Sequence, residues 1–355
     1  MPHAVLIADS SAARSEHNGR VSIGHLARAV HSSRSKYKFM LGLSAYFDES
    51  GHSEDARCRF VGMGGLIAPE SAWTEFEKKW QAVLDEQCEG HWFHMKDYAP
   101  GYGIYEGWGK KRREKLFGAL VKAVRESGAK PFGAVVSLDA YEIVCSAFPG
   151  IEKWLGDPYY ICFRDVTLAA AVSVISYSMH ATTTVEEWQE FEKTEKVAMV
   201  YARHDGFGTI SSSSGTRPEN MGRAESIWYD LRTNPAWGHW MGAYSSNLPQ
   251  NLVFLQAADL FAYELTHEFE NRVNRPQDPM RWGLAQMLPG SWRDFLHKFY
   301  GVPQLLNMLV ECRILGPHED PRHGLSINTS MSNIMHRDLL FGRMYERRNK
   351  DKPGN

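Results

Sequence analysis

The tetrapeptide Asp48-Glu49-Ser50-Gly51 is the segment of this sequence best suited to chemistry, because it places two carboxylates at the end of the apolar run 41–47. Carboxylates at the carboxyl end of a core strand cost desolvation free energy unless a cation or hydrogen-bond donors compensate them. Alternate side chains of a strand share a face, so Asp48 and Ser50 are expected on one side and Glu49 on the other. Glu49 rejoins Asp48 only if the strand ends or bulges there. An ordinary turn of Asp, Ser and Gly is the alternative.

Two further acids stand in comparable places. Asp205 follows a later apolar run, and α/β proteins commonly build sites at the carboxyl ends of strands; an Asp-Gly turn is the alternative. Asp259 lies in the first turns of a helix expected over 252–273, where Gln256 shares its face and Tyr263 continues it. The helix dipole alone also favours an acid at that position.

The segments that position these residues alternate between strand-like and helix-like patterns. Apolar runs bounded by turn residues predict five strands, and apolar residues at helical spacing predict the helices between them. The expected strands span 41–47, 59–68, 131–138, 197–203 and 237–244, and the expected helices span 71–87, 110–126, 159–179, 224–232 and 252–273. Strands interleaved with helices, with no Gly/Pro/Ser linker between them, indicate one α/β domain. The glycines of the second strand suggest a bulge or a close approach of another backbone.

Charge is unevenly distributed along the 355 residues. Lys and Arg number 40 and Asp and Glu 42, so the net charge is −2, but residues 1–40 carry +4 and residues 331–355 carry +3, which leaves −9 between them. This balance excludes a generally basic nucleic-acid coat protein and allows local binding. The three expected parts are a disordered basic extension over 1–40, a domain over 41–275, and a helical extension with a basic tail over 276–355. An organelle transit peptide is the alternative for the first part.

Cysteine usage and hydropathy favour a cytoplasmic protein without a membrane segment. The five cysteines are scattered and form no Cys-X-X-Cys pair, which is typical of reduced, buried thiols. The longest apolar run, 166–179, contains three serines and is shorter than the ~20 residues that span a membrane. We expect it to be part of a buried helix.

Two motifs together resemble the domain of unknown function 3800 family, which is grouped with the ribonuclease H-like folds. They are the strand ending in Asp48-Glu49-Ser50-Gly51 with the Gly-rich strand 62–69 after it, and Gln256-Ala257-Ala258-Asp259 followed by Ala262-Tyr263-Glu264. The resemblance covers about residues 43–270. It implies a ribonuclease H-like mixed central sheet of about five strands flanked by helices, with an inserted helix-loop region and a helical C-terminal extension.

The resemblance also implies a metal site. Asp48, Asp205 and Asp259 match the places where acids of this fold converge on Mg²⁺ or Mn²⁺, and Glu49 is a candidate fourth ligand. Two such ions ~3.5–4 Å apart can hold the attacking and leaving oxygens of an in-line phosphodiester displacement. Several carboxylates are needed, because the ions must be neutralised and held with open positions.

Other side chains are candidates for binding substrate or supporting the metal ligands. They are Ser50, His94, Lys96, Gln256 and Tyr263. His94 and Lys96 fall in the inserted region, where a His could orient water or touch a phosphate. A zinc site built on His91 and His94, or a packed loop with solvated charges, are the alternatives there. The cations of 110–113 open a helix, where they either contact phosphate or form a solvated face.

We therefore expect a divalent-metal-dependent nuclease or phosphodiester hydrolase that acts on RNA or DNA. The glutamate that the better-known nuclease pattern places on a helix after the third strand is not evident, and Glu142 is the nearest candidate. That departure and the negative body motivate an alternative from another class. The alternative is a non-catalytic ribonuclease H-like binding module that acts with a partner protein in a defence or mobile-element system.

Overall fold

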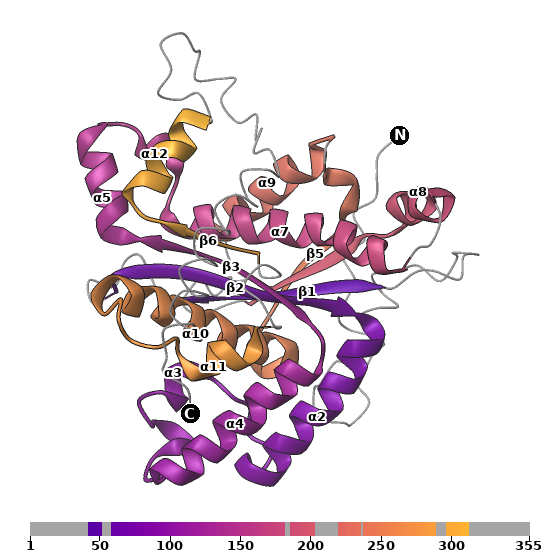
Figure 1. Cartoon of the computed structure of the whole chain (residues 1–355), viewed down its shortest axis with the longest axis vertical. Helices are drawn as coiled ribbons and strands as arrows, with labels where there is room; N and C mark the ends of the chain where they lie inside the picture. Colours follow the sequence, from indigo (N-terminus) through magenta and orange to yellow (C-terminus); the bar gives the residue numbers. More distant parts are fainter. Residues whose placement is uncertain are drawn as a thin grey trace, which may run out of the picture.

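The computed structural model describes residues 42–51, 58–181, 185–202, 219–235, 237–288 and 296–311. Among these residues, six strands form one sheet in the order β5-β4-β1-β2-β3-β6, with helices on both faces (Figure 1). The strands are β1 (Leu43–Ser50), β2 (Phe60–Pro69), β3 (Lys130–Ser137), β4 (Val197–Ala202), β5 (Met241–Asn247) and β6 (Leu296–Tyr300). The predicted α/β class with a mixed central sheet is confirmed. The predicted extension over 1–40 and the basic tail lie outside the described residues.

β1 lies inside the sheet, antiparallel to β2 and parallel to β4. β2 and β3 are antiparallel, while β3 and β6, and β4 and β5, run parallel. The central strands are buried almost throughout. They read as continuous apolar runs because helices cover both of their faces. All five predicted strands are present, although β5 begins at residue 241, after the 3-10 turn η2 (Gly238–Trp240).

The segment after residue 275 differs from the helical extension that the sequence predicts. β6 pairs with β3 as an edge strand of the same sheet, and α12 (Val302–Glu311) packs against α5. The sheet-containing domain thus continues at least to residue 311. The pattern was missed because β6, Leu-His-Lys-Phe-Tyr, is short and carries two polar residues in its middle, as edge strands often do.

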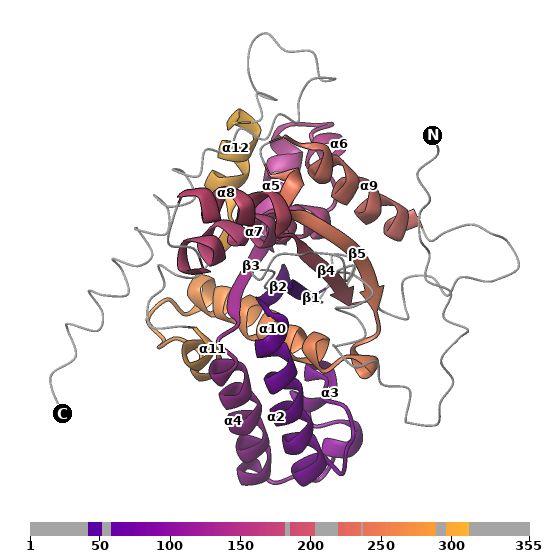
Figure 2. The same ribbon diagram turned by 90° about the vertical axis from the view of Figure 1, so that its right-hand side faces the viewer.

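The helices form a layer on each face of the sheet (Figures 1 and 2). One layer holds α10 (Val253–Asn274), α2 (Glu70–Cys88), α3 (Met95–Tyr98), α4 (Lys110–Glu126) and α11 (Trp282–Met287). The other holds α7 (Pro158–Ala181), α5 (Leu138–Ala147), α6 (Glu152–Leu155), α8 (Val185–Thr194), α9 (Glu219–Thr233) and α12. The predicted helices are all present. The inserted helix-loop region also contains α3 and the 3-10 turn η1 (Gly103–Tyr105), both before α4.

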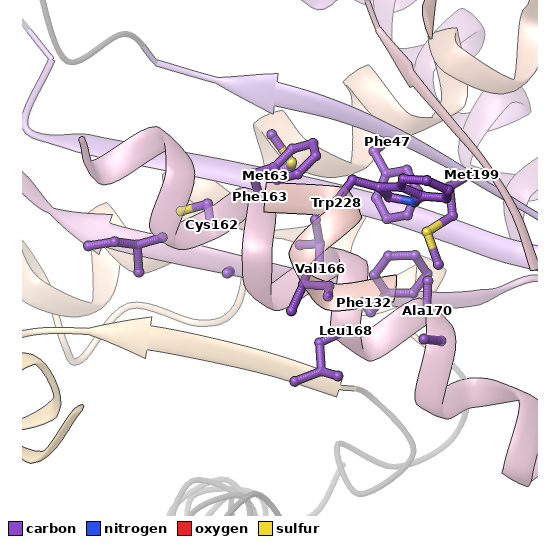
Figure 3. Packing of buried hydrophobic residues seen from close by; sticks show 14 of the residues in the cluster. Phe47, Met63, Phe132, Cys162, Phe163, Val166, Leu168, Ala170, Met199 and Trp228 are labelled. Atoms are coloured by element: carbon purple, nitrogen blue, oxygen red, sulfur yellow. The ribbon is translucent and has the colours of Figure 1, made fainter. Parts of the chain in front are cut away.

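α7 is the helix that contains the longest apolar run. By length and composition alone, its segment Pro158–Ser178 could cross a membrane. However, 67% of the apolar window in this segment is buried within the fold. It packs on β2 and β3, where its side chains join a core that includes Phe47, Phe132 and Met199 (Figure 3). The burial agrees with the predicted core helix. The four described cysteines are free thiols.

Glycines of β2 let α10 lie directly on the sheet. A side chain at Gly64 would place its Cβ 2.8 Å from the Cα of Ala262, so only a residue without a Cβ fits there. Gly62 lies against the Thr266 side chain of the same helix. The register between β1 and β2 is continuous. Of the two predicted reasons for these glycines, close backbone approach is therefore the one observed.

Candidate functional site

Asp48 points toward the α10 side of the sheet. β1 runs through Asp48 without a bulge, and Asp48 lies opposite Gly64 in the antiparallel register. Directly opposed residues of an antiparallel pair share a face, and Gly64 faces Ala262 of α10. The Asp48 side chain is only 3% exposed. Its Oδ1 accepts the backbone N–H of Glu49 at 2.8 Å.

Asp259 reaches the same side of the sheet from α10. It precedes Ala262 by three residues, or about 4.5 Å of helix, and it is 7% exposed. Its Oδ2 accepts the backbone N–H of Met95 at 2.6 Å, and this bond ties the start of α3 to α10. Asp48 and Asp259 are thus two buried carboxylates on the same side of the sheet, one opposite Gly64 and the other one turn of helix before Ala262.

Glu49 lies on the opposite side of the sheet from Asp48. It is opposite Met63, which belongs to the core on the α7 side. The pKa of Tyr159 on α7 confirms that Glu49 lies on this side. Burial raises this pKa well above its usual range, and the negative charge of Glu49 raises it further. The strand end or bulge that would bring Glu49 beside Asp48 does not occur. Ser50, opposite Gly62, shares the Asp48 side as predicted.

Gln256 holds three separate segments together. Its Oε1 accepts the backbone N–H of Phe93 at 3.0 Å and the indole N–H of Trp80 at 3.1 Å, and its Nε2 donates to the carbonyl of Pro249 at 3.1 Å. The side chain is 2% exposed. These contacts give the amide a structural role. The sequence did not reveal it, because the partners on α2 and in the inserted region are remote along the chain.

Replacing Gln256 with Leu is expected to lower the free energy of unfolding by about 1–3 kcal/mol for each buried polar group left without its bond. The substitution should also increase hydrogen exchange over 93–98, because the Phe93 anchor is removed. Urea denaturation and amide exchange measure the two effects. Gln286→Leu is the matched control, since Gln286 bonds Arg125 near the surface; equal losses of stability in the two variants would contradict the assignment.

The inserted segment borders Asp259 through His94 and Met95. The bond from Met95 to Asp259 places the backbone of His94 next to this carboxylate. The His94 ring stacks on Trp92, with 5.1 Å between centroids, and its Nδ1 lies 3.3 Å from an oxygen of Asp97. Lys96 is exposed. His94 thus lies beside the candidate site, while Lys96 stands at its solvent side.

Tyr263 lies one turn beyond Asp259 on α10. Its ring stacks on His267 with 3.9 Å between centroids, and the Arg281 guanidinium lies 5.7 Å from the Tyr263 ring. Burial raises the pKa of the Tyr263 hydroxyl, and among smaller causes the charge of Asp259 raises it further. Tyr263 therefore belongs to the surroundings of Asp259, as the shared helix face predicts.

His267 makes the stability of this region depend on pH. Burial lowers the pKa of its imidazole below the ordinary value of 6.5, so the folded protein favours the neutral ring. The free energy of unfolding is therefore unaffected by this group above pH 6.5. It decreases as the pH falls below that value, because the unfolded chain then binds the proton more readily than the folded protein does. We expect the free energy of unfolding to fall more steeply between pH 7 and 5 for wild type than for His267→Gln. Parallel urea titrations with equal pH slopes would contradict this.

A second set of buried acids on α10 is neutralised by arginines. Glu264 and Glu268 are each 2% exposed. Glu264 pairs with the guanidinium of Arg281, while Glu268 pairs with Arg272 and accepts the backbone N–H of Arg281. Buried charges of this kind are costly unless they are paired. These acids therefore fix α11 against α10, and the Glu of the second sequence motif has a structural partner.

Asp205, the third predicted ligand, lies outside the described residues, so the structure places two of the three predicted metal ligands, both on the α10 side of the sheet. Within the described residues, no group of three or more His, Cys, Asp or Glu side chains is arranged to hold a metal ion. Among these residues, neither the zinc alternative at His91 and His94 nor the pair Asp48 and Asp259 therefore has a third ligand. No protein-family model matches the chain, and neither a curated protein nor a solved structure matches it.

Proposed function

We propose that the chain is a divalent-metal-dependent nuclease or phosphodiester hydrolase with a ribonuclease H-like fold. One observation carries the proposal: Asp48 and Asp259, far apart in sequence, lie buried on the same side of the sheet around the contact between Gly64 and Ala262. Two buried carboxylates on the same side of a sheet need cations or donors to compensate their desolvation. The mixed sheet, with an acid at the end of β1 and another on a late helix, is consistent with this fold.

The donor set suits a hard cation in part. Carboxylate oxygens are the ligands that Mg²⁺ and Mn²⁺ prefer, and Asp48 and Asp259 supply them. One oxygen of each carboxylate already accepts a backbone N–H, which fixes the orientation of that carboxylate. A complete site also requires a ligand from outside the described residues, and Asp205 is the predicted one. When bound, the metal would stabilise developing charge and activate water.

The chain's own side chains would position the reaction. Gln256 and Asp259 fix the inserted segment through Phe93 and Met95, which places His94 at the border of the site. From there, His94 would orient water or hydrogen-bond a phosphate oxygen. Glu49 faces the other side of the sheet, so the proposal assigns it no contact with substrate.

A non-catalytic binding module is the second candidate. The observation that favours it is that Gln256 and Asp259, both in the second sequence motif, bind backbone and indole donors of α2 and the inserted segment. A structural role can explain these residues without a metal. The module would act with a partner protein. A cytoplasmic location is the proposal for either candidate.

Metal-dependent cleavage separates the two candidates. We expect the full chain to bind Mn²⁺ in calorimetry and to cleave labelled RNA or DNA in Mn²⁺ or Mg²⁺ but not in EDTA. Single- and double-stranded forms of both nucleic acids should be offered, with bis(p-nitrophenyl) phosphate as a minimal diester. An Asp259→Asn variant that cleaves at the wild-type rate, or the absence of Mn²⁺ binding at millimolar concentration, would refute the nuclease proposal; the absence of binding would favour the module.

A further inference from the structure

The inserted region between β2 and β3 carries a surface of cations and aromatic rings away from the sheet. Figure 2 shows α2 and α4 side by side, extending from the body of the molecule, with α3 next to them. We call the exposed and partly exposed side chains around the start of α4 the tip surface; it consists of Lys96, Tyr102, Trp108, Lys111, Arg112 and Arg113. The candidate site on α10 does not explain why this surface exists.

The cations of the tip surface do not serve helix stability. α4 begins at Lys110 with four consecutive basic residues and has no acid in its first turn, so their charges oppose the helix dipole. Lys110 lies 3.8 Å from Glu114. Within the described part of the chain, no carboxylate lies within 4.0 Å of Lys111, Arg112 or Arg113. Lys111 and Arg113 are therefore available to an anion, while the Arg112 guanidinium, which donates to the carbonyl of Gln87 at 3.4 Å, keeps further N–H donors.

Aromatic rings lie among these cations. The Arg112 guanidinium lies 3.6 Å from the centre of the Trp108 ring. Tyr102 is 66% exposed, which is unusual for a ring that packing alone would place. Gly101, its neighbour, lies beside the Arg113 guanidinium: a Cβ on Gly101 would be 3.4 Å from Nη1 of Arg113. Cations that bind phosphates, interleaved with rings on which bases stack, are the two components of a surface for single-stranded nucleic acid.

A short path connects the tip surface to the two buried acids. Met95, the first residue of α3, is bonded to Asp259. Tyr98, the last residue of α3, donates its hydroxyl to the carbonyl of Arg113 at 2.8 Å and stacks on Phe117 of α4. The four residues of α3 thus span the interval between Asp259 and the start of α4. A strand lying on the tip surface would lead toward Asp48 and Asp259.

We propose that the tip surface binds single-stranded nucleic acid, with Lys111, Arg112 and Arg113 on the phosphates and Tyr102 under a base. The exposed ring favours a single strand over a duplex, because paired bases are not available for stacking. It also favours nucleic acid over an acidic protein segment, which would engage the cations alone. Binding does not require metal; delivery of the strand to the acids rests on the function proposed above.

The test is fluorescence anisotropy of a labelled single strand of about 20 nucleotides, longer than the site size of one typical binding module, with the full chain in EDTA. The double variant Lys111→Glu/Arg113→Glu is expected to weaken binding by at least about tenfold at roughly 0.1 M salt. The slope of the logarithm of the binding constant against the logarithm of the salt concentration should decrease in magnitude by about 0.7 for each phosphate that the variant no longer neutralises. Lys153→Glu/Lys196→Glu is the matched control. It makes the same change of charge at two exposed positions elsewhere in the chain, and it should change the affinity less than about threefold.

The Tyr102→Ala variant tests the contribution of base stacking separately from that of electrostatic attraction. We expect it to weaken binding of the oligonucleotide at least about fivefold, the effect of removing one ring on which a base stacks, and to leave binding of inorganic polyphosphate unchanged. The proposal is overturned if the double variant binds the single strand like wild type, or if a duplex of equal length binds as tightly. It is also overturned if Tyr102→Ala has no effect while polyglutamate competes as well as the oligonucleotide, which would indicate an acidic protein partner.

This proposal and the proposed function fail in different ways. Hydrolysis of bis(p-nitrophenyl) phosphate by wild type in Mn²⁺ reports on the acidic site alone. This diester is too small to contact the tip surface while it is bound at Asp48 and Asp259. Diester hydrolysis without tip-dependent strand binding would overturn only the inference about the tip surface. Tip-dependent binding in EDTA without any diester hydrolysis would overturn only the proposed function.

Discussion

Replacing Asp48 with Asn is expected to lower Mn²⁺-dependent hydrolysis of a phosphodiester by about 10³-fold. Asn keeps the size of the side chain and can still accept the N–H of Glu49, so the fold should persist while the charge that neutralises the cation is removed. Bound metal supplies several kcal/mol of transition-state stabilisation, and each ~1.36 kcal/mol corresponds to a factor of ten in rate. Initial rates over a range of Mn²⁺ concentrations measure the effect.

Two other carboxylates serve as controls for this variant. Asp139→Asn removes an exposed carboxylate that pairs with Arg59 at the surface, and it should leave the rate within about twofold of wild type. Glu49→Gln should cost less than about tenfold, because Glu49 faces the α7 side. A rate for Asp48→Asn that equals the rate for Asp139→Asn would contradict a catalytic role for Asp48.

Replacing Gly64 with Ala is expected to lower the free energy of unfolding by about 1–3 kcal/mol, the usual cost of overpacking a core. The new Cβ would lie 2.8 Å from Cα and 2.9 Å from the backbone nitrogen of Ala262. Backbone atoms cannot move aside as a flexible side chain can, so the whole of α10 must shift. The shift should also move Asp259 away from Asp48 and reduce diester hydrolysis.

Gly118→Ala provides the matched control. Gly118 lies inside α4, and its new Cβ would meet only the Trp282 ring, at an ordinary contact distance of 3.8 Å. Because Ala favours a helix more than Gly does, this variant should gain up to about 1 kcal/mol. Urea denaturation of both variants gives the comparison. Equal changes in the free energy of unfolding for Gly64→Ala and Gly118→Ala would mean that the packing of α10 on the sheet does not depend on Gly64.

Local patterns predicted most of the sheet and the long helices. A strand buried on both faces, such as β4, is a continuous apolar run, β1 is mostly apolar up to Phe47, and α4 begins and ends at the predicted residues. β6 was missed because an edge strand needs no such run. α3 was missed because a four-residue helix leaves no periodic pattern.

The candidate site was predictable where it depends on strand alternation and not where it depends on long-range contacts. Alternation placed Asp48 and Glu49 on opposite faces, and the register confirms it. The glycines of β2 indicated a close approach, but not that α10 would supply it. The bonds from Phe93 and Met95 to the second motif could not be foreseen, because they join segments that meet only in the folded chain.

A crystal of the full chain soaked in Mn²⁺ tests most directly whether Asp48 and Asp259 form a shared metal site. Anomalous diffraction locates Mn²⁺ without assumptions about substrate. The account predicts a peak at bonding distance, roughly 2.0–2.3 Å, from a carboxylate oxygen of both residues, and its disappearance in Asp48→Asn. Ordered Asp48 and Asp259 side chains that point apart, with no peak between them at millimolar Mn²⁺, would contradict it.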